Sequence, residues 1–294
     1  MRVSRTPSVR IVEVGPRDGL QNEKRIVPTS VKLELIRRLA AAGLRHIEAT
    51  SFVSPKWVPQ MADHVAILES LDAGGDIAFP VLTPNLKGFE SAVACGAKEV
   101  AVFAAASESF SQKNINCSIA ESLHRFEPIM KIAARQGIRV RAYVSCVVGC
   151  PYEGAVAPVQ VAVVAGTLRE LGCYEVSLGD TIGCGTPGDV VRMLDEVTKH
   201  VPIEMLAGHY HDTGKLALRN ILASYQYGMR TFDSSIGGLG GCPYAEGASG
   251  NVATERVVQM FNDMHVETGI NLPALLDCSG WISAQLQRSL PEQA

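Results

Sequence analysis

The sequence predicts an α/β protein, a (β/α)8 TIM barrel built as a single domain. Eight short β-rich runs recur along the chain, and longer segments rich in Ala, Leu, Glu and Arg lie between them. Several of these longer segments end in a glycine directly before the next run, as helices commonly do. Such regular alternation of strands and helices, repeated eight times, favours a closed barrel over an open doubly wound sheet.

The individual elements follow these patterns in chain order. The predicted strands are 9–14, 46–50, 78–82, 99–103, 139–145, 175–178, 205–211 and 230–235. The predicted helices are 31–42, 86–95, 118–136, 158–171, 187–199 and 216–227. Glycines stand just past five of these helices, at Gly43, Gly96, Gly137, Gly172 and Gly228. A dinucleotide site is disfavoured, because the glycine run GGLGG at 237–241 leads into Cys242 and Pro243 and not into a helix.

No linker rich in Ser, Gly or Pro and no run of charge divides the 294 residues. We therefore expect one catalytic domain, with the barrel at about 9–261 and a C-terminal extension at 262–294 that forms a short helical tail. The 47% of hydrophobic residues and 19% of charged residues allow a large core and exclude wholesale disorder.

The charge balance excludes two classes of partner. With 27 basic and 30 acidic residues the net charge is −3, which disfavours nucleic-acid binding. The most apolar stretch, 154–168, is short and contains Pro158, so no membrane span is expected. Eight cysteines could suggest disulfide bonds, but no secretory segment follows Met1. We therefore expect reduced thiols and a cytoplasmic protein.

In a barrel of this type the chemistry lies at the C-terminal ends of the strands. The first predicted strand runs directly into GPRDG at 15–19, which places Arg17 and Asp18 side by side at that end. Asp before Gly is also a common turn former, and taken alone this pair favours a turn.

Two histidines, His209 and His211, end the seventh predicted strand. Residues two apart on a strand share a face, so both imidazoles are expected to point toward the barrel axis. This closeness favours a divalent metal between them over a hydrogen-bonded core histidine. Imidazoles combined with a carboxylate such as Asp18 and a carbonyl oxygen suit Mg, Mn, Co or Zn.

The loop after the last predicted strand, 237–251, is rich in glycine and small residues. Asn251 could supply an amide oxygen to the metal, although spacing alone favours a helix N-cap for 252–261. Cys242 could deliver a reactive group from a mobile lid, or it could be a buried small apolar residue.

Two further carboxylates stand at strand ends. Glu48 follows the second strand and, facing inward, could orient Arg17 or a water; its alternative is a buried ion pair without a catalytic role. Asp180 follows the sixth strand and could support the site or cap a helix.

With these residues placed, the sequence resembles the 3-hydroxy-3-methylglutaryl-CoA lyase family, one branch of the metal-dependent barrel lyases that also include isopropylmalate and homocitrate synthases. The resemblance covers nearly the whole chain. Its motifs are VEVGPRDGLQNE at 12–23, EATSFVSPKWVPQMAD at 48–63, PVLTPNLKG at 80–88, KNINCS at 113–118, YVSCVVGCPYEG at 143–154, SLGDTIGCGTPG at 177–188 and DSSIGGLGGCPYAEGASGN at 233–251. Arg-Asp with His-x-His is shared by the superfamily, whereas GGLGGCPYAEGASGN is specific to the lyase branch.

The resemblance implies a metal site and a reaction. It implies that Mg²⁺ or Mn²⁺ is held by Asp18, His209, His211 and Asn251, and this overrides the local turn and cap interpretations of Asp18 and Asn251. It also implies cleavage of the CoA-thioester 3-hydroxy-3-methylglutaryl-CoA to acetyl-CoA and acetoacetate, in which a base removes the 3-hydroxyl proton and the C2–C3 bond breaks.

The same resemblance implies roles for the remaining residues. Arg17 stabilises the enolate oxygen, His209 and Cys242 transfer protons, and Glu48 and Asp180 support the site. The implied substrate contacts are Arg17, Gln21, Lys113, Asn114 and Ser145. A homodimer is also expected.

Two departures from the family pattern affect what the resemblance implies. The strand-seven motif continues with Gly214 and Lys215 where family members usually have HDTYG, which places a lysine near the site entrance. The tail is short, so Arg288 alone stands where more basic residues are expected to meet the CoA phosphates. The competing hypotheses are the same cleavage on a substrate with a larger 3-substituent such as isohexenyl, a condensing synthase, and a non-catalytic metal-binding barrel.

Overall fold

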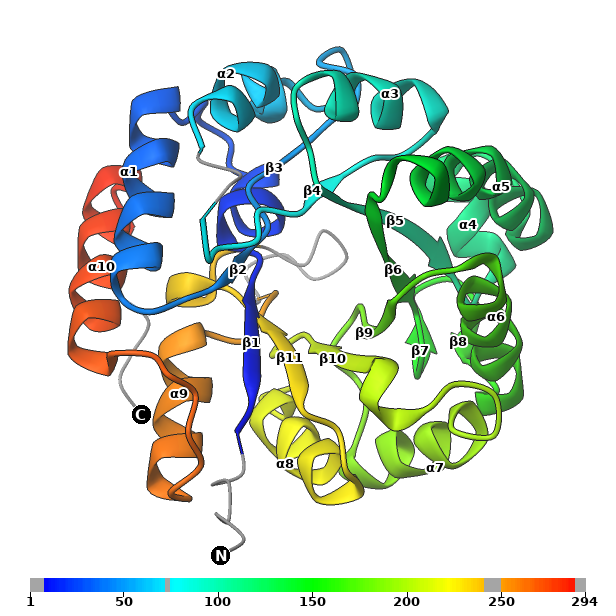
Figure 1. Cartoon of the computed structure of the whole chain (residues 1–294). Coiled ribbons are helices and arrows are strands. Elements are labelled where there is room, and N and C mark those ends of the chain that lie inside the picture. Colours follow the sequence, from blue (N-terminus) through cyan, green and yellow to red (C-terminus); the bar gives the residue numbers. More distant parts are fainter. Residues whose placement is uncertain (1–7, 72–74, 241–249, 289–294) are drawn as a thin grey trace, which may run out of the picture.

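The computed structural model describes residues 8–71, 75–240 and 250–288. Viewed along its axis, it has parallel strands around a centre and helices in an outer ring (Figure 1). The main sheet has the order β2-β1-β11-β10-β9-β6-β5-β4-β3. Its strands are β1 (Arg10–Glu13), β2 (His46–Ile47), β3 (Thr50–Ser51), β4 (Val81–Leu82), β5 (Glu99–Ala105), β6 (Arg139–Ser145), β9 (Glu175–Asp180), β10 (Leu206–Tyr210) and β11 (Thr231–Ser234).

The two ends of this sheet are consecutive pieces of one predicted strand, 46–50, so the sheet closes. The amide of Glu48 donates to the carbonyl oxygen of Glu13 on β1 at 2.8 Å. The next amide, of Ala49, donates to Pro80 beside β4 at 3.0 Å. One segment therefore pairs with neighbours on both sides, and the predicted eight-stranded barrel is confirmed.

Helices follow the strands as predicted, with two additions. They are α1 (Thr29–Ala41), α2 (His64–Glu69), α3 (Leu86–Ala94), α4 (Glu108–Ile115), α5 (Ile119–Gln136), α6 (Pro158–Leu171), α7 (Pro187–Val197), α8 (Ala217–Tyr227), α9 (Thr254–Asp263) and α10 (Leu272–Leu286). The sequence did not predict α2 or α4, because the first is short and the second is largely polar. An antiparallel pair, β7 (Gly149–Cys150) and β8 (Gly154–Ala155), was also not predicted.

Side chains and glycines define the helix ends. The hydroxyl groups of Ser107 and Ser118 accept hydrogen bonds from Phe110 and Glu121, and so begin α4 and α5. Gly137 and Gly172 end α5 and α6 with φ of 67° and 111°, values that favour glycine.

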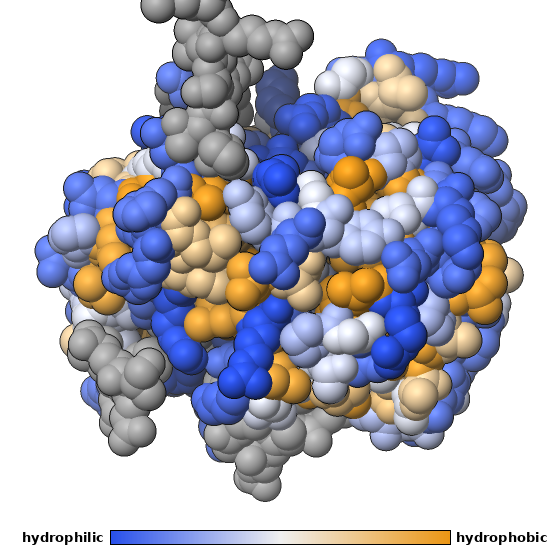
Figure 2. All heavy atoms as spheres, turned by 90° about the horizontal axis from the view of Figure 1, so that it is seen from below, coloured by the Kyte–Doolittle hydropathy of each residue, from blue (hydrophilic) through white to orange (hydrophobic). Residues whose placement is uncertain are grey.

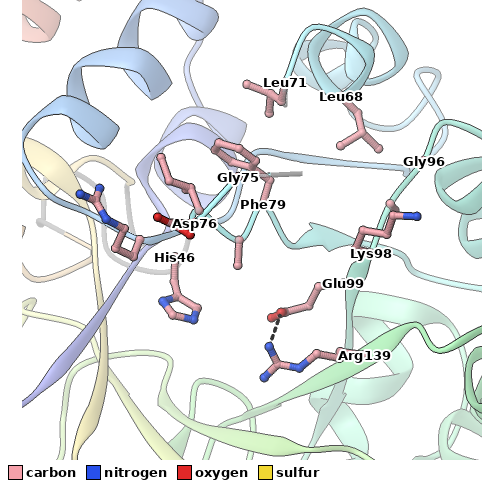
Figure 3. A pocket seen from close by; sticks show the side chains of 14 residues that line it. His46, Leu68, Leu71, Gly75, Asp76, Phe79, Gly96, Lys98, Glu99 and Arg139 are labelled. Atoms are coloured by element: carbon pink, nitrogen blue, oxygen red, sulfur yellow. Dashed lines mark ion pairs between the residues drawn. The ribbon is translucent and has the colours of Figure 1, made fainter. Parts of the chain in front are cut away.

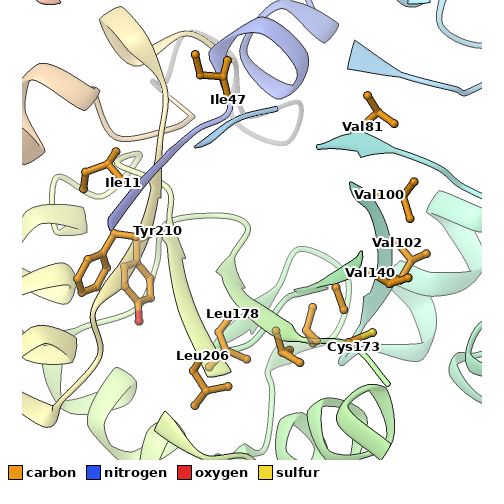
Figure 4. Close-up of a cluster of buried hydrophobic side chains, with 14 of the residues drawn as sticks. Ile11, Ile47, Val81, Val100, Val102, Val140, Cys173, Leu178, Leu206 and Tyr210 are labelled. Carbon is orange, nitrogen blue, oxygen red and sulfur yellow. The ribbon is translucent and has the colours of Figure 1, made fainter. Parts of the chain in front are cut away.

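The main apolar core lies between the strands and the helices. Outward-facing residues of successive strands, among them Ile11, Val100 and Leu178, fill this layer (Figure 4). Their burial gives the helices and the sheet their stability. By contrast, charged side chains occupy much of the inside of the barrel. Arg141 on β6 bonds Asp233 on β11, and because β9 and β10 separate these strands in the sheet, the two side chains meet across the interior.

The C-terminal segment packs onto the start of the barrel. Helix α10 lies beside α1 (Figure 1), and the Arg38 guanidinium stacks 4.7 Å from the centre of the Trp281 ring. On the face seen from below, apolar side chains form separate small patches among hydrophilic ones (Figure 2). Among the described residues, no helix combines the length and apolar character needed to cross a bilayer.

Candidate active site

Three predicted metal ligands meet at the C-terminal end of the barrel. Asp18 lies in a single π-helical turn, Gly15–Gly19, directly after β1. His209 belongs to β10 and His211 follows it, and their ring centres are 5.4 Å apart. The potential ligand atoms of all three residues lie within 4.8 Å of one another, which makes this a possible metal site.

Asn251 joins this cluster through the backbone. It forms an isolated antiparallel bridge with His211, and the Asp212 amide donates to Gly250 at 2.7 Å. The side-chain Nδ2 of Asn251 donates to Asp18 Oδ2 at 2.7 Å and to the Leu239 carbonyl oxygen at 3.2 Å. The helix-cap interpretation of Asn251 is wrong, because α9 begins at Thr254 and its N-cap is Ala253.

The free atoms of this cluster fit a divalent cation. His209 uses Nδ1 to contact Asp233 Oδ2 at 3.1 Å, which leaves its Nε2 available. His211 Nδ1 is buried and has no hydrogen-bond partner within the described part of the chain. Since an unsatisfied buried imidazole nitrogen is costly, a metal ligand role accounts for it. Imidazole nitrogens with carboxylate and amide oxygens form a donor set for Mg, Mn, Co or Zn.

Arg17 is buried beside the cluster and is fixed from two sides. Its Nε donates to Glu48 Oε2 and its Nη1 to Asp18 Oδ1, both at 2.7 Å. A further nitrogen, Nη2, lies 2.7 Å from the same Glu48 oxygen. Glu48 therefore faces inward and contacts Arg17, and its role in catalysis stays a prediction.

The charges of this group depend on one another. Burial disfavours the charged form of Arg17, but Glu48 and Asp18 raise its pKa above the ordinary value. Burial acts to raise the pKa of Asp18, yet Arg17 and His209 lower it to about 2. Burial raises the pKa of Glu48, and Arg17 opposes that rise. Arg17 and Asp18 are therefore held in their charged forms.

Asp180 is fully buried at the end of β9 and organises the following loop. Its carboxylate accepts the amides of Gly185 at 2.8 Å and Cys184 at 3.3 Å. It does not cap α7, whose N-cap is Thr186. Its backbone carbonyl accepts the His211 amide at 3.3 Å, so within the described part of the chain Asp180 is joined to the Asp18–His209–His211 cluster through the main chain.

The predicted substrate contacts lie at several places on the same end of the barrel. Gln21 has a buried Oε1 without a partner among the described residues, beside a hollow of about 230 Å³. Ser145 ends β6 and is half-buried. Lys113 and Asn114 are exposed on α4, where the Lys113 ammonium lies 4.8 Å from the centre of the Tyr152 ring. The described hydrogen bonds do not join these two residues to the cluster.

The two departures are also on the surface. Lys215 is exposed in the turn after β10, with a left-handed φ of 58°. Arg288 pairs with Glu23 at 2.5 Å, which brings the tail to the rim near Gln21. The predicted lid residue Cys242 lies outside the described residues.

A family model described as HMGL-like matches residues 8–282. The chain belongs to the HMGL-like family. The "Hydroxymethylglutaryl-CoA lyase, mitochondrial" of Bos taurus is 59% identical over 280 residues, covering 95% of this chain and 86% of the relative. The resemblance to 3-hydroxy-3-methylglutaryl-CoA lyases is therefore confirmed.

Solved structures agree with this HMGL-like assignment. The hydroxymethylglutaryl-CoA lyase of Pseudomonas aeruginosa matches with a TM-score of 0.95 and 54% identity, covering 98% of this chain and 97% of the other. An HMG-CoA lyase from Acinetobacter baumannii, in complex with coenzyme A and 3-methylmalate, matches with a TM-score of 0.92 and 37% identity, covering 97% and 93%.

Sequence reasoning missed three residues around the site of this HMGL-like barrel. Tyr143 lies near two guanidinium groups. The centre of its ring is 5.6 Å from Cζ of Arg17 and 4.9 Å from Cζ of Arg141. Its ring also meets His209 edge-on at 6.0 Å. Asp233 bonds His209 from β11. The available signal was the presence of two charged residues of opposite sign, Arg141 and Asp233, within predicted strands.

A second, larger hollow of about 340 Å³ opens at the opposite end of the HMGL-like barrel. His46, Glu99 and Arg139, at the starts of their strands, line it together with Asp76 and Lys98 (Figure 3). Arg139 pairs with Glu99 at 3.3 Å. Since catalytic groups of such barrels occupy the C-terminal end, this hollow is separate from the chemistry.

Proposed function

We propose that this chain is a divalent-metal-dependent lyase that cleaves 3-hydroxy-3-methylglutaryl-CoA to acetyl-CoA and acetoacetate. The observation that carries the proposal is the meeting of Asp18, His209, His211 and Asn251 with a fixed Arg17 at the catalytic end of an HMGL-like barrel. A metal held by such ligands and a buried guanidinium beside it can both stabilise the negative charge of an enolate.

Asp18, His209, His211 and Asn251 would hold the metal, and Mg²⁺ or Mn²⁺ is the proposed ion. The two imidazoles also permit Co²⁺ or Zn²⁺. When bound, such an ion makes the 3-hydroxyl of the substrate more acidic and orients it. Asp18 suits this role because it stays ionised beside Arg17.

Arg17 provides the positive charge for the thioester enolate. A guanidinium has five N–H donors, and among the described residues three of them are directed at Glu48 and Asp18, which leaves two for the substrate. Because the group is already buried and fixed, it need not reorganise when negative charge develops on the carbonyl oxygen. Glu48 thus acts on the reaction through Arg17.

The proton transfers are assigned to His209 and Cys242. His209 faces the interior next to Asp18 and contacts Asp233 through Nδ1. Nε2 can accept a proton only while it does not hold the metal, so proton transfer and metal binding at Nε2 are alternating roles of His209. Cys242 enters from the sequence motif alone. Asp180 supports the site by holding the loop 181–186 against the end of β10.

The CoA portion is assigned to the rim. Gln21, Ser145, Lys113 and Asn114 are the proposed contacts, and Arg288 is proposed for a phosphate group. The support is their position at the C-terminal end, with cationic side chains exposed to solvent as phosphate binding requires.

The test is acetoacetate release from 3-hydroxy-3-methylglutaryl-CoA by metal-stripped protein, with and without Mg²⁺ or Mn²⁺. Metal-restored activity that vanishes in Asp18→Asn supports both site and reaction. If metal binds and nothing is cleaved, the substrate assignment is wrong. Comparison of kcat/KM over thioesters with larger 3-substituents then tests whether the turn that carries Lys215 alters acyl specificity.

The assembly and compartment are part of the same proposal. We propose a homodimer, supported by the low fraction of charged residues, 19%, and tested by sedimentation. Relatives carry both mitochondrial and cytoplasmic designations in their names. A cytoplasmic location is proposed because the described cysteines are free thiols.

A further inference from the structure

Asp233 lies at the centre of a buried network that ends on a proposed metal ligand. Its carboxylate has 0% exposure and stands opposite His209 in the pairing of β10 with β11. Oδ2 contacts His209 Nδ1 at 3.1 Å and accepts the Ser177 hydroxyl at 2.7 Å. Oδ1 accepts Arg141 Nη2 at 2.7 Å, and Arg141 Nη1 lies 3.2 Å from Oδ2.

These contacts prevent the carboxylate from turning. A guanidinium that binds both oxygens of a carboxylate fixes its plane as well as its position. Arg141 is itself fixed, since its Nε donates to Glu175 Oε1 at 2.7 Å. Glu175 in turn pairs with Arg10, whose Nη2 also donates to Thr231 at 2.9 Å.

A fixed acceptor at Nδ1 decides how His209 can act. In neutral imidazole one nitrogen carries the proton and the other has the lone pair that binds a metal. With Nδ1–H directed at Asp233, the lone pair is on Nε2, the nitrogen left on the side of Asp18 and His211. Outer carboxylates of this kind orient metal-binding histidines and increase their basicity.

We infer that Asp233 is a positioning residue that fixes the ring orientation and tautomer of His209 for metal binding, and that Arg141 holds Asp233 in place. This inference rests on the proposed function, because it concerns the proposed metal site. It assigns to the ionic interior of the barrel a function besides stability.

The first test measures Mn²⁺ binding to the full chain from the electron paramagnetic resonance signal of free Mn²⁺. Asp233→Asn should raise the Mn²⁺ Kd about 10- to 100-fold. Glu99→Gln is the matched control, because Glu99 is also a nearly buried, ion-paired carboxylate but stands at the other end of the barrel. We expect Glu99→Gln to keep the parent Kd for Mn²⁺ within about twofold, even if its melting temperature falls as much as that of Asp233→Asn.

The outcomes separate the two proposals. If the parent chain binds Mn²⁺ and folded Asp233→Asn binds it equally well, the positioning role is overturned while the metal site stands. If the parent chain binds no Mn²⁺, the proposed metal site itself fails, and the inference fails with it.

A second measurement does not depend on the folding of a variant. Nitrogen-15 NMR of the Mg²⁺-loaded parent chain reports which imidazole nitrogen carries the proton, and His209→Gln assigns the resonances. A protonated Nδ1 and an unprotonated Nε2 on His209 are expected. The reverse tautomer would overturn the inference.

Discussion

Arg17 binds Glu48 through two nitrogens on a single oxygen, since Nε and Nη2 each lie 2.7 Å from Oε2. The second carboxylate oxygen of Glu48, Oε1, is buried without a hydrogen-bond partner in the described part of the chain. The Arg17–Glu48 pair is therefore rigid, but Oε1 of Glu48 can still accept a hydrogen bond. A polar atom of the substrate, or a water, that reaches Oε1 would complete it, which couples the binding of substrate to the position of Arg17.

Arg17→Lys should lower kcat about 10²- to 10³-fold. Lysine keeps the charge but cannot bind Glu48 and Asp18 together while also facing an oxyanion, because it lacks the planar fork of donors. Acetoacetate release measures the effect. Arg38→Lys, on the outer helix α1, is the control and should retain parent activity. An Arg17→Lys enzyme with more than about a tenth of the parent kcat would contradict the assigned role.

Glu48→Ala should lower the free energy of unfolding by about 3–5 kcal/mol, because it leaves the buried Arg17 charge without its main partner. Urea denaturation measures this change. Glu34→Ala is the control, since it removes an ion-pair partner of Arg37 and Arg38 at the surface. If both substitutions lowered the free energy of unfolding equally, the buried Arg17–Glu48 pair would contribute no more to stability than a surface ion pair.

Divalent metal should stabilise the fold. At a free Mn²⁺ concentration about 100 times the Kd, binding to the native state alone adds about 2.7 kcal/mol to the free energy of unfolding. Thermal melts of stripped protein with added Mn²⁺ should therefore shift upward, and the shift should be lost in Asp18→Asn. A melting temperature that does not respond to Mn²⁺ in the parent chain would argue against the cluster as a metal site.

Glu13 should make stability fall as the pH rises. Burial raises the pKa of Glu13 to about 7, although Thr254 and the amides of Ile236 and Gly15 donate to it. Its ordinary pKa of 4.5 applies to the unfolded chain. Between these two values the folded chain holds one more proton, so the contribution is present below pH 4.5 and lost through pH 7.

The loss from Glu13 is on the order of 3 kcal/mol. Unfolding by urea at pH 5 and pH 8 measures it in the parent and in Glu13→Gln. The free energy of unfolding of the parent, relative to that of Glu13→Gln, should be lower at pH 8 than at pH 5. A variant with the same pH dependence as the parent would show that Glu13 does not titrate in this range.

Gly183→Ala should weaken metal binding. A Cβ atom at Gly183 would lie 2.7 Å from the backbone oxygen of His211, so the backbone of that ligand must shift. Gly137→Ala is a matched control with a similar left-handed φ, 67° against 62°, and with open space at its Cβ. Both substitutions should cost roughly 1–2 kcal/mol of stability from backbone strain. Only Gly183→Ala should raise the Mn²⁺ Kd, and an unchanged Kd would contradict the close contact.

Much of the fold could be predicted from the sequence because each β-rich run and each helix has a local signature. The runs 139–145 and 175–178 match β6 and most of β9, and the predicted helix 158–171 matches α6. The break at Glu48 and Ala49 could not be predicted, since it depends on two neighbours that pair with one segment from opposite sides.

The proposed metal ligands could be predicted for a different reason. His209 and His211 could be predicted from their spacing, whereas Asp18 taken alone favoured a turn and entered the predicted ligand set through the family resemblance. Asp233 and Arg141 are visible as charged residues within strands, but the sequence did not show that they pair, because the two residues are 92 positions apart and meet across the interior. The local pattern around Asn251 pointed to a helix cap, and only its bridge to His211 shows why it faces the site.

The ionic interior also constrains how the protein can be made. Arg141 becomes available on β6 long before Asp233 emerges on β11, and Arg10 precedes its partner Glu175 by 165 residues. A nascent chain that stops short of β11 therefore has Glu175 as a partner for both arginines but lacks Asp233, the carboxylate that binds both Nη atoms of Arg141. Arg141 cannot complete its contacts before the last strand is made, and the cluster at the site is complete only once Asn251 joins Asp18 and His211.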